Sequence, residues 1–592
     1  MSNLHGYHGQ YLQVDVTSGT AQPKPLNPEL LRTYLGGSGL GTRLLLEHEA
    51  WKHDPLAPES SLVFAFSPLV GSPLTTSAKF AVVSRSPLTG RINDSLASST
   101  FAIAGKRTGH DAILIQGRAA IPSILVIDED NVSLQSAEHL WRLSADQAET
   151  RLREDFGKDY SFAVIGPGGE NLVRYATISH SGRHAGRGGS GAVLGSKNIK
   201  AIAVRGTKRT DWANSEGLVE RARDLSKRSF GPATEKYREL GTAANVLVFN
   251  RLRCLPTRNF QRGSFDGSAE LSPEAMDAAR DKMKSSCAVC TIGCTHIYDI
   301  PLDGQTHSTR IEYENLFALG PLCEVRDQQT VLQASQLCDH YGIDTISTGG
   351  TIAFAMECVE RGLLDEPWLR FGDGEALLKA IHLIGQVEGV GKQFALGSRV
   401  LAQTIGNDSI AFAPQVKGLE LPGYEPRALQ TMALGFAVGT RGADHNRSGA
   451  YEVDFMESVD RRNVTIEQAR LAVETEDKAA IMDSMILCKF LRGVFDDYFA
   501  ESSEMLNLVT GWSLTREDLL ESARSIINAK KKFNIASGWT PKEDTLPSRM
   551  LTSALDDDDQ ATLNHETLQS LIQAYNLARG WDKTGYLETT SL

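Results

Sequence analysis

The pattern of apolar and polar positions divides the chain into a β-rich beginning and a mainly helical remainder. Up to about residue 208, short apolar runs alternate with Gly, Pro and Ser, as in strands joined by turns. Seven runs are expected to be strands: YLQVDVT, SLVFAFSPL, KFAVVSRS, AILIQG, SILVID, SFAVIG and NIKAIAVRG. Helical periodicity is rare in this part, with residues 30–34 and 144–156 as examples.

From residue 214 onward, apolar positions recur at the spacing of amphipathic helices. The helices expected there cover residues 215–229, 330–341, 351–360, 466–490, 516–532 and 565–578. A polar segment after Arg205 and a strand-and-loop stretch near 411–422 mark two boundaries. The pattern therefore predicts an α+β protein in which a β-rich domain (1–208) precedes two mainly helical domains (209–415 and 416–592).

Composition and charge narrow the classes of function. The chain is 41% hydrophobic and 23% charged, as in ordinary globular proteins. Its net charge of -12 argues against nucleic acid or an anionic membrane as partner, because both bind basic surfaces. No secretory signal and no bilayer-spanning apolar run are recognisable, so a cytoplasmic protein is expected. In that compartment its eight cysteines would be thiols or metal ligands.

The clearest chemical motif is CAVCTIGCTH at residues 287–296. Cys287, Cys290 and Cys294 are spaced so that one loop can supply three ligands to one metal centre, as in iron–sulfur proteins. The fourth ligand must then come from a distant part of the chain. The spacing alone also allows zinc, with His296 or another residue as fourth ligand, or three unrelated buried thiols.

Two short segments share one spacing of polar and apolar residues at the end of an expected helix. They are DHYGID at residues 339–344 and DSMILC at residues 483–488. The pattern is weak by itself, because acidic residues at such spacing are common on helices. The second copy ends in Cys488, which is therefore a candidate for the missing fourth ligand.

Two glycine-rich stretches are candidates for close approach of the backbone to a phosphate. Residues 182–204 combine glycines with Arg183, Arg187, Lys197 and Lys200. Residues 35–48, LGGSGLGTRLLLEH, run from a glycine loop into a helix. They lack the spacing and the later acidic residue of a dinucleotide fingerprint, so a structural turn is expected there.

Together these motifs resemble the aldehyde:ferredoxin oxidoreductase family of tungsten–pyranopterin enzymes, over nearly the whole chain. The matching pieces, in chain order, are SRSPLTG (84–90), GRGGSGAVLGSKNIKAI (186–202), LPTRNF (255–260), CAVCTIGC (287–294), EYENLFALG (312–320), CDHYGID (338–344), KGLELPGYEPR (417–427), RGADH (441–445) and DSMILCKF (483–490). The resemblance implies a β-rich base that binds pterins, one 4Fe–4S cluster, and tungsten (or molybdenum) between two pyranopterins. It also implies a magnesium ion that bridges the pterin phosphates.

Carried onto this sequence, the resemblance assigns residues to these groups. The cluster ligands would be Cys287, Cys290, Cys294 and Cys488. The pterin contacts would be Lys79, Gly186, Arg187, Gly188, Asp339, Gly342, Ile343, Asp344, Asp483, Leu487 and Cys488. The catalytic residues would be Glu314 and His445 beside the metal and Tyr424 in the substrate pocket. Without the resemblance, these three would be interpreted as a surface acid, a core histidine and a packed aromatic.

The resemblance implies an enzyme that oxidises aldehydes to carboxylic acids. Electrons would pass through the cluster to ferredoxin or a small iron–sulfur subunit. The chain departs from the family pattern at Ile486, where glycine is usual, and at Leu96, Ser98 and Ser99. These departures keep two alternatives open: reduction of aromatic rings in coenzyme A thioesters, and a non-catalytic iron–sulfur relay or assembly subunit. Assembly of the chain with itself or with partner subunits is also left open.

Overall fold

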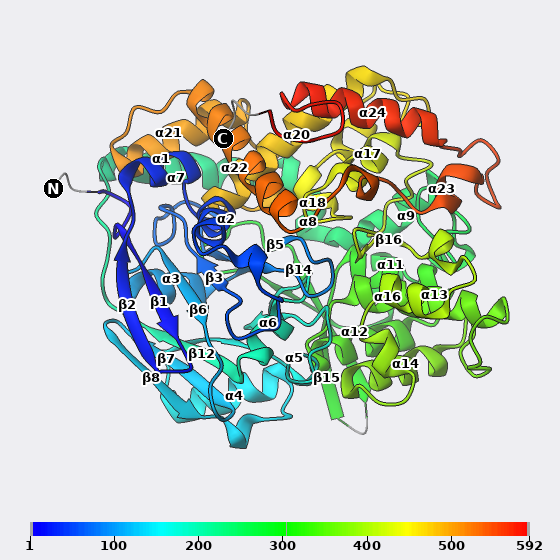
Figure 1. Ribbon diagram of the computed structural model, residues 1–592, viewed down its shortest axis with the longest axis horizontal. Coiled ribbons are helices and arrows are strands. Elements are labelled where there is room, and N and C mark those ends of the chain that lie inside the picture. The colour runs from blue at the N-terminus through cyan, green and yellow to red at the C-terminus, as the bar shows by residue number, and fades with distance from the viewer. Residues whose placement is uncertain (1–3, 303–304, 589–592) are drawn as a thin grey trace.

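The computed structural model describes residues 4–302 and 305–588. Its N-terminal part, blue to cyan in Figure 1, contains two six-stranded sheets. The first has the order β2-β1-β6-β3-β4-β5, with β1 at Gln10–Asp15, β2 at Thr20–Pro25, β3 at Leu62–Ala65, β4 at Lys79–Arg85, β5 at Ile92–Ser98 and β6 at Ala112–Gln116. The second has the order β11-β10-β9-β12-β7-β8, with β7 at Ser123–Asp128, β8 at Asn131–Ser136, β9 at Ser161–Val164, β10 at Ile178–His180, β11 at Arg183–Ala185 and β12 at Ile199–Arg205.

All seven strands expected from the sequence are present. Their residues form continuous apolar runs because central strands such as β3 and β6 are buried on both faces. The strands that the pattern missed are short or polar. Strand β5 has the polar sequence INDSLAS, yet all of its residues except the half-buried Leu96 are buried. It lies at the edge of the first sheet, beside β4.

Six helices accompany these sheets: α1 at Pro28–Tyr34, α2 at Gly37–Glu47, α3 at Thr100–Arg107, α4 at Ala145–Phe156, α5 at Pro167–Glu170 and α6 at Ser190–Ser196. The glycine loop runs into a helix as expected, and its turn is short, because Leu35 ends α1 and helix α2 already begins at Gly37. Its glycines allow a close approach of backbone. A Cβ atom at Gly37 would lie 2.4 Å from the carbonyl oxygen of Asp483, far along the chain.

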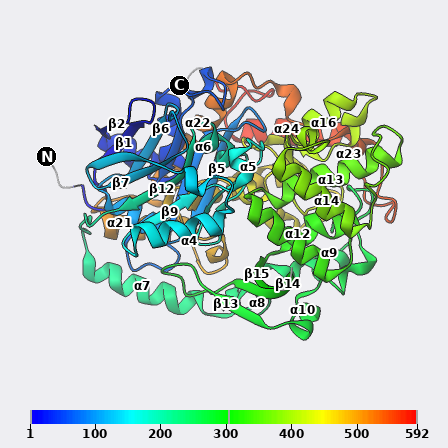
Figure 2. The ribbon, with the colours of Figure 1, turned by 90° about the horizontal axis from the view of Figure 1, so that it is seen from below.

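The remainder is mainly helical. It contains α7 (Ser215–Ser229), α8 (Pro232–Leu240), α9 (Asn245–Arg251), α10 (Pro273–Ala279), α11 (Tyr313–Leu319), α12 (Gln328–Tyr341), α13 (Thr345–Glu360), α14 (Gly374–Gln386), α15 (Gly391–Phe394), α16 (Ser398–Ile405), α17 (Gln430–Val438), α18 (His445–Ser448), α19 (Tyr451–Asp454), α20 (Ile466–Met485), α21 (Tyr498–Thr510), α22 (Arg516–Ala536), α23 (Ser548–Thr552) and α24 (His565–Ala578). A small sheet, β13 (Lys282–Ser285), β14 (Thr295–Leu302) and β15 (Gln305–Ile311), lies beside α8 and α10 in Figure 2. Strands β16 (Gln415–Val416) and β17 (Leu419–Glu420) form a short pair.

The predicted α+β class is confirmed, whereas the exact division into domains at residues 208 and 415 stays a prediction. The expectation of one helix over residues 466–490 is wrong, because α20 ends at Met485 and Ile486 turns into the left-handed region with φ +64°. Among the described residues, no helix combines the length and the apolar character that a membrane crossing requires.

Candidate functional site

A cavity of about 690 Å³ lies between the N-terminal sheets and the helical remainder. Every predicted site residue lines this cavity except the two glycines Gly188 and Gly342. Gly188 lies behind the wall, where its φ of +83° and the missing Cβ leave room for the Asn93 side chain. The volume falls within the range of roughly 300–1,000 Å³ typical of ligand pockets. The fold therefore gathers residues from positions 79 to 488 around one space.

The loop with three cysteines connects β13 to β14 and is clamped by Thr75 and Thr76. Thr76 donates its backbone N–H to the Val289 carbonyl at 2.6 Å. Its hydroxyl accepts the backbone N–H of Cys488 at 3.1 Å. One short segment of the N-terminal part thus fixes both the cysteine loop and the distant fourth cysteine.

All four cysteines lie close enough to Lys79 to shift its pKa. Burial lowers the pKa of Lys79, but the charges of Cys488, Cys287, Cys290 and Cys294 outweigh burial and raise it above its ordinary value. Burial also raises the pKa values of the Cys290 and Cys294 thiols. All four sulfurs therefore surround one region, in which thiolates need a cation to compensate them.

The zinc alternative with His296 as ligand receives no support from this geometry. His296 is buried, its Nε2 atom lies 3.2 Å from the carbonyl oxygen of Arg238, and it does not line the cavity. Within residues 4–302 and 305–588, no three His, Cys, Asp or Glu side chains gather tightly enough to hold a single metal ion.

The segments 339–344 and 483–488 have the same backbone conformation. In each, a helix ends at a left-handed residue, Gly342 (φ +66°) or Ile486 (φ +64°). The backbone N–H of the next residue then returns to a carbonyl five positions earlier, at 3.0 Å in the first segment and 2.9 Å in the second. The weak pattern in the sequence therefore corresponds to a real structural repeat at the cavity wall.

Ile486, at the position where the family pattern usually has glycine, turns its side chain away from the cavity. Its side chain is fully buried on the other side, in a core cluster of the N-terminal part, and it does not line the cavity. Its Cδ1 and Cγ1 atoms occupy the space next to Gly37, where a Cβ would lie 2.9 Å away. The neighbouring Leu487 and Cys488 line the cavity instead.

Buried charges surround both segments. Asp344 accepts the Arg187 Nε–H at 3.2 Å and also caps α13. Asp483 lies 3.1 Å from Arg447 and 3.0 Å from Lys489. Both Asp483 oxygens are therefore held in ion pairs at the cavity wall.

The sequence missed the cationic residues Arg441 and Arg447, which line the cavity. Arg441 is the first residue of the RGADH motif and Arg447 follows two residues after it, so the motif itself could have indicated them. Lys197 and Lys200 were expected to add charge here, and that expectation is wrong. Lys197 donates to backbone carbonyls at Pro58 and Ser60, and Lys200 pairs with Glu170 away from the cavity.

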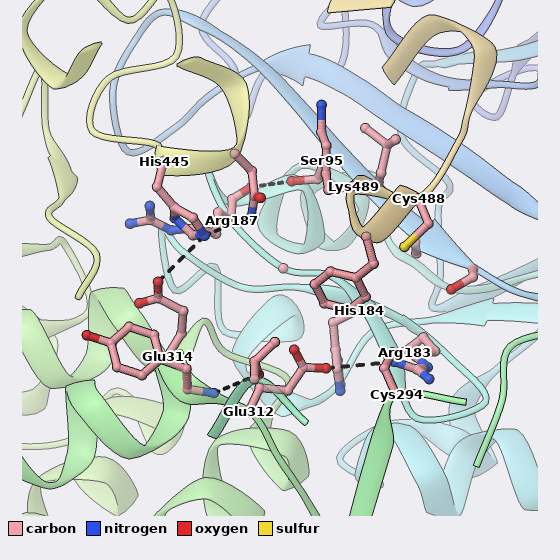
Figure 3. A pocket seen from close by; sticks show the side chains of 18 of the residues that line it. Ser95, Arg183, His184, Arg187, Cys294, Glu312, Glu314, His445, Cys488 and Lys489 are labelled. Carbon is pink, nitrogen blue, oxygen red and sulfur yellow. Dashed lines mark hydrogen bonds and ion pairs between the residues drawn. The ribbon is translucent and has the colours of Figure 1, made fainter. Parts of the chain in front are cut away.

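Glu314 and His445 face each other on one side of the cavity, while Cys294 and Cys488 lie toward the other side (Figure 3). The distance from Glu314 Oε1 to His445 Nε2 is 3.6 Å, and Oε1 has no hydrogen-bond partner among the described residues. Burial raises the pKa of Glu314 to about 8. Burial also lowers the pKa of His445 to about 3, so the imidazole stays neutral at physiological pH.

Aromatic rings pack around this pair. Tyr424 is buried and stacks on His445 with ring centroids 4.9 Å apart. Tyr451 stacks on Tyr424 at 5.0 Å, and Phe249 meets Tyr424 edge-on at 5.2 Å. All of these side chains line the cavity. Nothing in the local sequence distinguished Tyr451 or Phe249 from ordinary core aromatics, because only the packing of α9, α18 and α19 brings them to this wall.

Comparisons with known proteins agree with this arrangement. Residues 11–206 match the family model for the N-terminal domain of aldehyde ferredoxin oxidoreductase, and residues 218–592 match that for its domains 2 and 3. A tungsten-containing aldehyde ferredoxin oxidoreductase of Pyrococcus abyssi is 36% identical over 100% of this chain and 98% of its own length. The protein of the same name from Pyrococcus furiosus is 34% identical over the same shares.

More distant similarities extend the comparison. An aliphatic sulfonate oxidoreductase, WOR-like subunit, of Pyrococcus furiosus is 29% identical over 98% of this chain and 96% of its own length. The active site complex BamBC of benzoyl coenzyme A reductase shares the fold, with a TM-score of 0.84 and 22% identity over 100% of this chain and 97% of that one. The chain belongs to the aldehyde ferredoxin oxidoreductase family and is an oxidoreductase of the tungsten–pyranopterin type.

Proposed function

We propose that this enzyme oxidises aldehydes to carboxylic acids and passes the electrons through a 4Fe–4S cluster to ferredoxin or a small iron–sulfur subunit. The observation that carries the proposal is the Glu314–His445 pair, with an unpartnered carboxylate oxygen, in the cavity that four cysteines also line. Aldehyde ferredoxin oxidoreductases of two Pyrococcus species, similar over the whole chain, support the substrate class.

The residues of the cavity fit the proposed cofactors. Cys287, Cys290, Cys294 and Cys488 supply four sulfur ligands, as a 4Fe–4S cluster requires. The carboxylates of Asp339 and Asp483 line the cavity and suit the N–H groups of a pterin. Arg187, Arg441 and Arg447 suit its phosphates. Magnesium between the phosphates stays a prediction.

The reaction is RCHO + H₂O → RCOOH + 2H⁺ + 2e⁻. When bound, the tungsten–pyranopterin group accepts the two electrons and acts as a Lewis acid toward oxygen. Neutral His445 donates an N–H to the carbonyl oxygen and stabilises the negative charge that develops there. The Glu314 carboxylate accepts a proton from the attacking water. Tyr424 holds the imidazole ring of His445 in place by stacking on it.

Glu314→Gln tests this proposal. A general base contributes roughly 10²- to 10⁴-fold to rate, so kcat should fall by at least about 100-fold while tungsten and iron contents stay unchanged. The matched control is Glu312→Gln, which removes a carboxylate that lines the same cavity but is 43% exposed. The control should stay within a few-fold of the wild type. Near-normal turnover of Glu314→Gln with full tungsten would refute the assignment.

The pH profile gives an independent readout of the same residue. A base acts in its deprotonated form, and the pKa of Glu314 is raised to about 8. Aldehyde oxidation should therefore rise with pH and level off above about pH 8. Glu314→Gln should remove this titration from the residual activity, which a purely structural glutamate would not do.

Aromatic-ring reduction of coenzyme A thioesters is the second candidate. The aromatic wall of Phe249, Tyr424 and Tyr451 could hold a flat ring. The fold is also that of the BamBC complex of benzoyl coenzyme A reductase. Parallel assays with aliphatic and aromatic aldehydes and with benzoyl coenzyme A decide between the two. Thioester reduction without aldehyde oxidation, in protein with full tungsten, would favour this candidate. The non-catalytic relay subunit is not retained, because the family consists of oxidoreductases.

A partner subunit is proposed on the same grounds. Ferredoxin is the acceptor in the name of the family, and two similar proteins are described as a subunit and as part of a complex. Co-purification of the chain from its own host tests for an iron–sulfur partner. A chain that purifies alone and reduces ferredoxin directly would argue for the simpler arrangement.

A further inference from the structure

Ser98, the last residue of β5, places its hydroxyl against the first cysteine of the loop. Ser98 Oγ lies 3.1 Å from Cys287 Sγ, and the serine is 6% exposed. Cys287 is the only hydrogen-bond partner of this hydroxyl within the described ranges. Ser98 is also the register partner of Lys79 across the β4–β5 pair, so both residues reach the cysteines from the same end of the sheet.

The chemistry of a ligated cysteine fixes the direction of this hydrogen bond. A sulfur that binds iron is a thiolate and carries no hydrogen, so it can only accept. The Ser98 hydroxyl must then be the donor. Hydrogen bonds to cluster sulfurs stabilise the more negative, reduced state and thereby move the reduction potential to less negative values.

We propose that Ser98 is a positioning residue that sets the reduction potential of the cluster through its hydrogen bond to Cys287. The inference rests on the proposed cluster at the four cysteines and deepens it. It also gives a physical purpose to one of the positions at which this chain departs from the family pattern. Electrons leave the active site singly through the cluster, so its potential determines how favourable that transfer is.

The adjacent Ser99 has a different contact and serves as a built-in comparison. Its hydroxyl accepts the backbone N–H of Ala288, so it holds the loop without touching sulfur. It does not cap α3, and the N–H of Phe101 is accepted instead by His180 Nε2 at 3.1 Å. Ser99 therefore anchors the loop, whereas Ser98 hydrogen-bonds to the sulfur, so the two contributions can be tested separately.

The experiment is a redox titration of the cluster, followed by electron paramagnetic resonance, on wild type, Ser98→Ala, Ser98→Thr and Ser99→Ala. Iron is counted in every sample. In Ser98→Ala the reduction potential of the cluster should become more negative by about 59 mV. For a one-electron couple, this shift lowers the ratio of reduced to oxidised cluster on the order of tenfold at the wild-type midpoint potential. Ser98→Thr keeps a hydroxyl and should therefore have the wild-type reduction potential. Ser99→Ala should also have the wild-type reduction potential.

The outcomes separate this inference from the proposed function. An unchanged potential in Ser98→Ala with four irons per chain would overturn the inference and leave the cluster in place. Equal shifts in Ser98→Ala and Ser99→Ala would also overturn it, because displacement of the loop would then explain both. A wild-type protein without iron would overturn the cluster and the inference together. Aldehyde turnover does not enter the decision.

Discussion

The chain reaches the cavity twice at the end of a helix, at residues 339–344 and at residues 483–488, with one backbone conformation and two sets of side chains. The first segment turns at Gly342, which needs no Cβ, and ends in Asp344, which caps the next helix. The second turns at Ile486 and ends in Cys488, whose sulfur faces the cavity. The same turn thus ends once in a carboxylate and once in a candidate iron ligand.

The packing behind each turn explains the difference at its centre. A Cβ at Gly342 would lie 2.9 Å from the backbone nitrogen of Gly166, the N-cap residue of α5, so it would press on backbone and not on a flexible side chain. Behind Ile486 stands Gly37, whose missing side chain leaves a space that the isoleucine fills. A left-handed β-branched residue is strained by roughly 1–2 kcal/mol, and burial of its side chain offsets this strain.

The largest effect is expected from a change at Cys488, because the two segments differ most in chemistry at their last residue. Cys488→Ser replaces a thiolate ligand by a hydroxyl, so iron should fall below four per chain and turnover by at least about 100-fold. Cys338→Ala is the matched control, because it removes a buried thiol next to the first segment that does not line the cavity. Iron analysis and aldehyde assays measure both. Four irons in Cys488→Ser would remove this residue from the ligand set.

A smaller effect is expected from Gly342→Ala, which should lower the free energy of unfolding by about 2–3 kcal/mol. The control is Gly362→Ala, with φ +69° and no atom within 4 Å of the added Cβ. The control carries only the left-handed penalty of about 1 kcal/mol. Guanidinium denaturation compares the two variants. Equal losses would show that contact with Gly166 contributes nothing.

The smallest difference between a variant and its control is expected for Ile486→Ala. Removal of a buried isoleucine side chain costs about 2–5 kcal/mol at either position. Alanine keeps the Cβ that strains a left-handed turn and relieves only the strain from β-branching, so the loss should be smaller than in Ile481→Ala by less than about 1 kcal/mol. Ile481 is equally buried on the same helix and has helical geometry. If Ile486→Ala lowered the free energy of unfolding more than Ile481→Ala, the backbone at Ile486 would not be strained.

Local sequence was sufficient for features that depend on neighbours along the chain. Seven buried strands followed from continuous apolar runs, and the spacing of the cysteines at residues 287–294 by itself indicated one metal centre. The end of α12 was also predictable, because glycine favours the left-handed turn. The end of α20 at Met485 was not, because isoleucine carries no local preference for such a turn.

Only the tertiary structure decided what the departures from the family pattern do. It brings Gly37 against Asp483, Thr76 against Cys488 and Ser98 against Cys287, across hundreds of residues. Most of the site residues that the sequence named line the cavity, but they are a minority of its lining. The sequence could not show that Ile486 turns away from the cavity or that Ser98 meets a sulfur. Those contacts depend on how separate elements pack, and spacing along one chain does not record the distance between them in space.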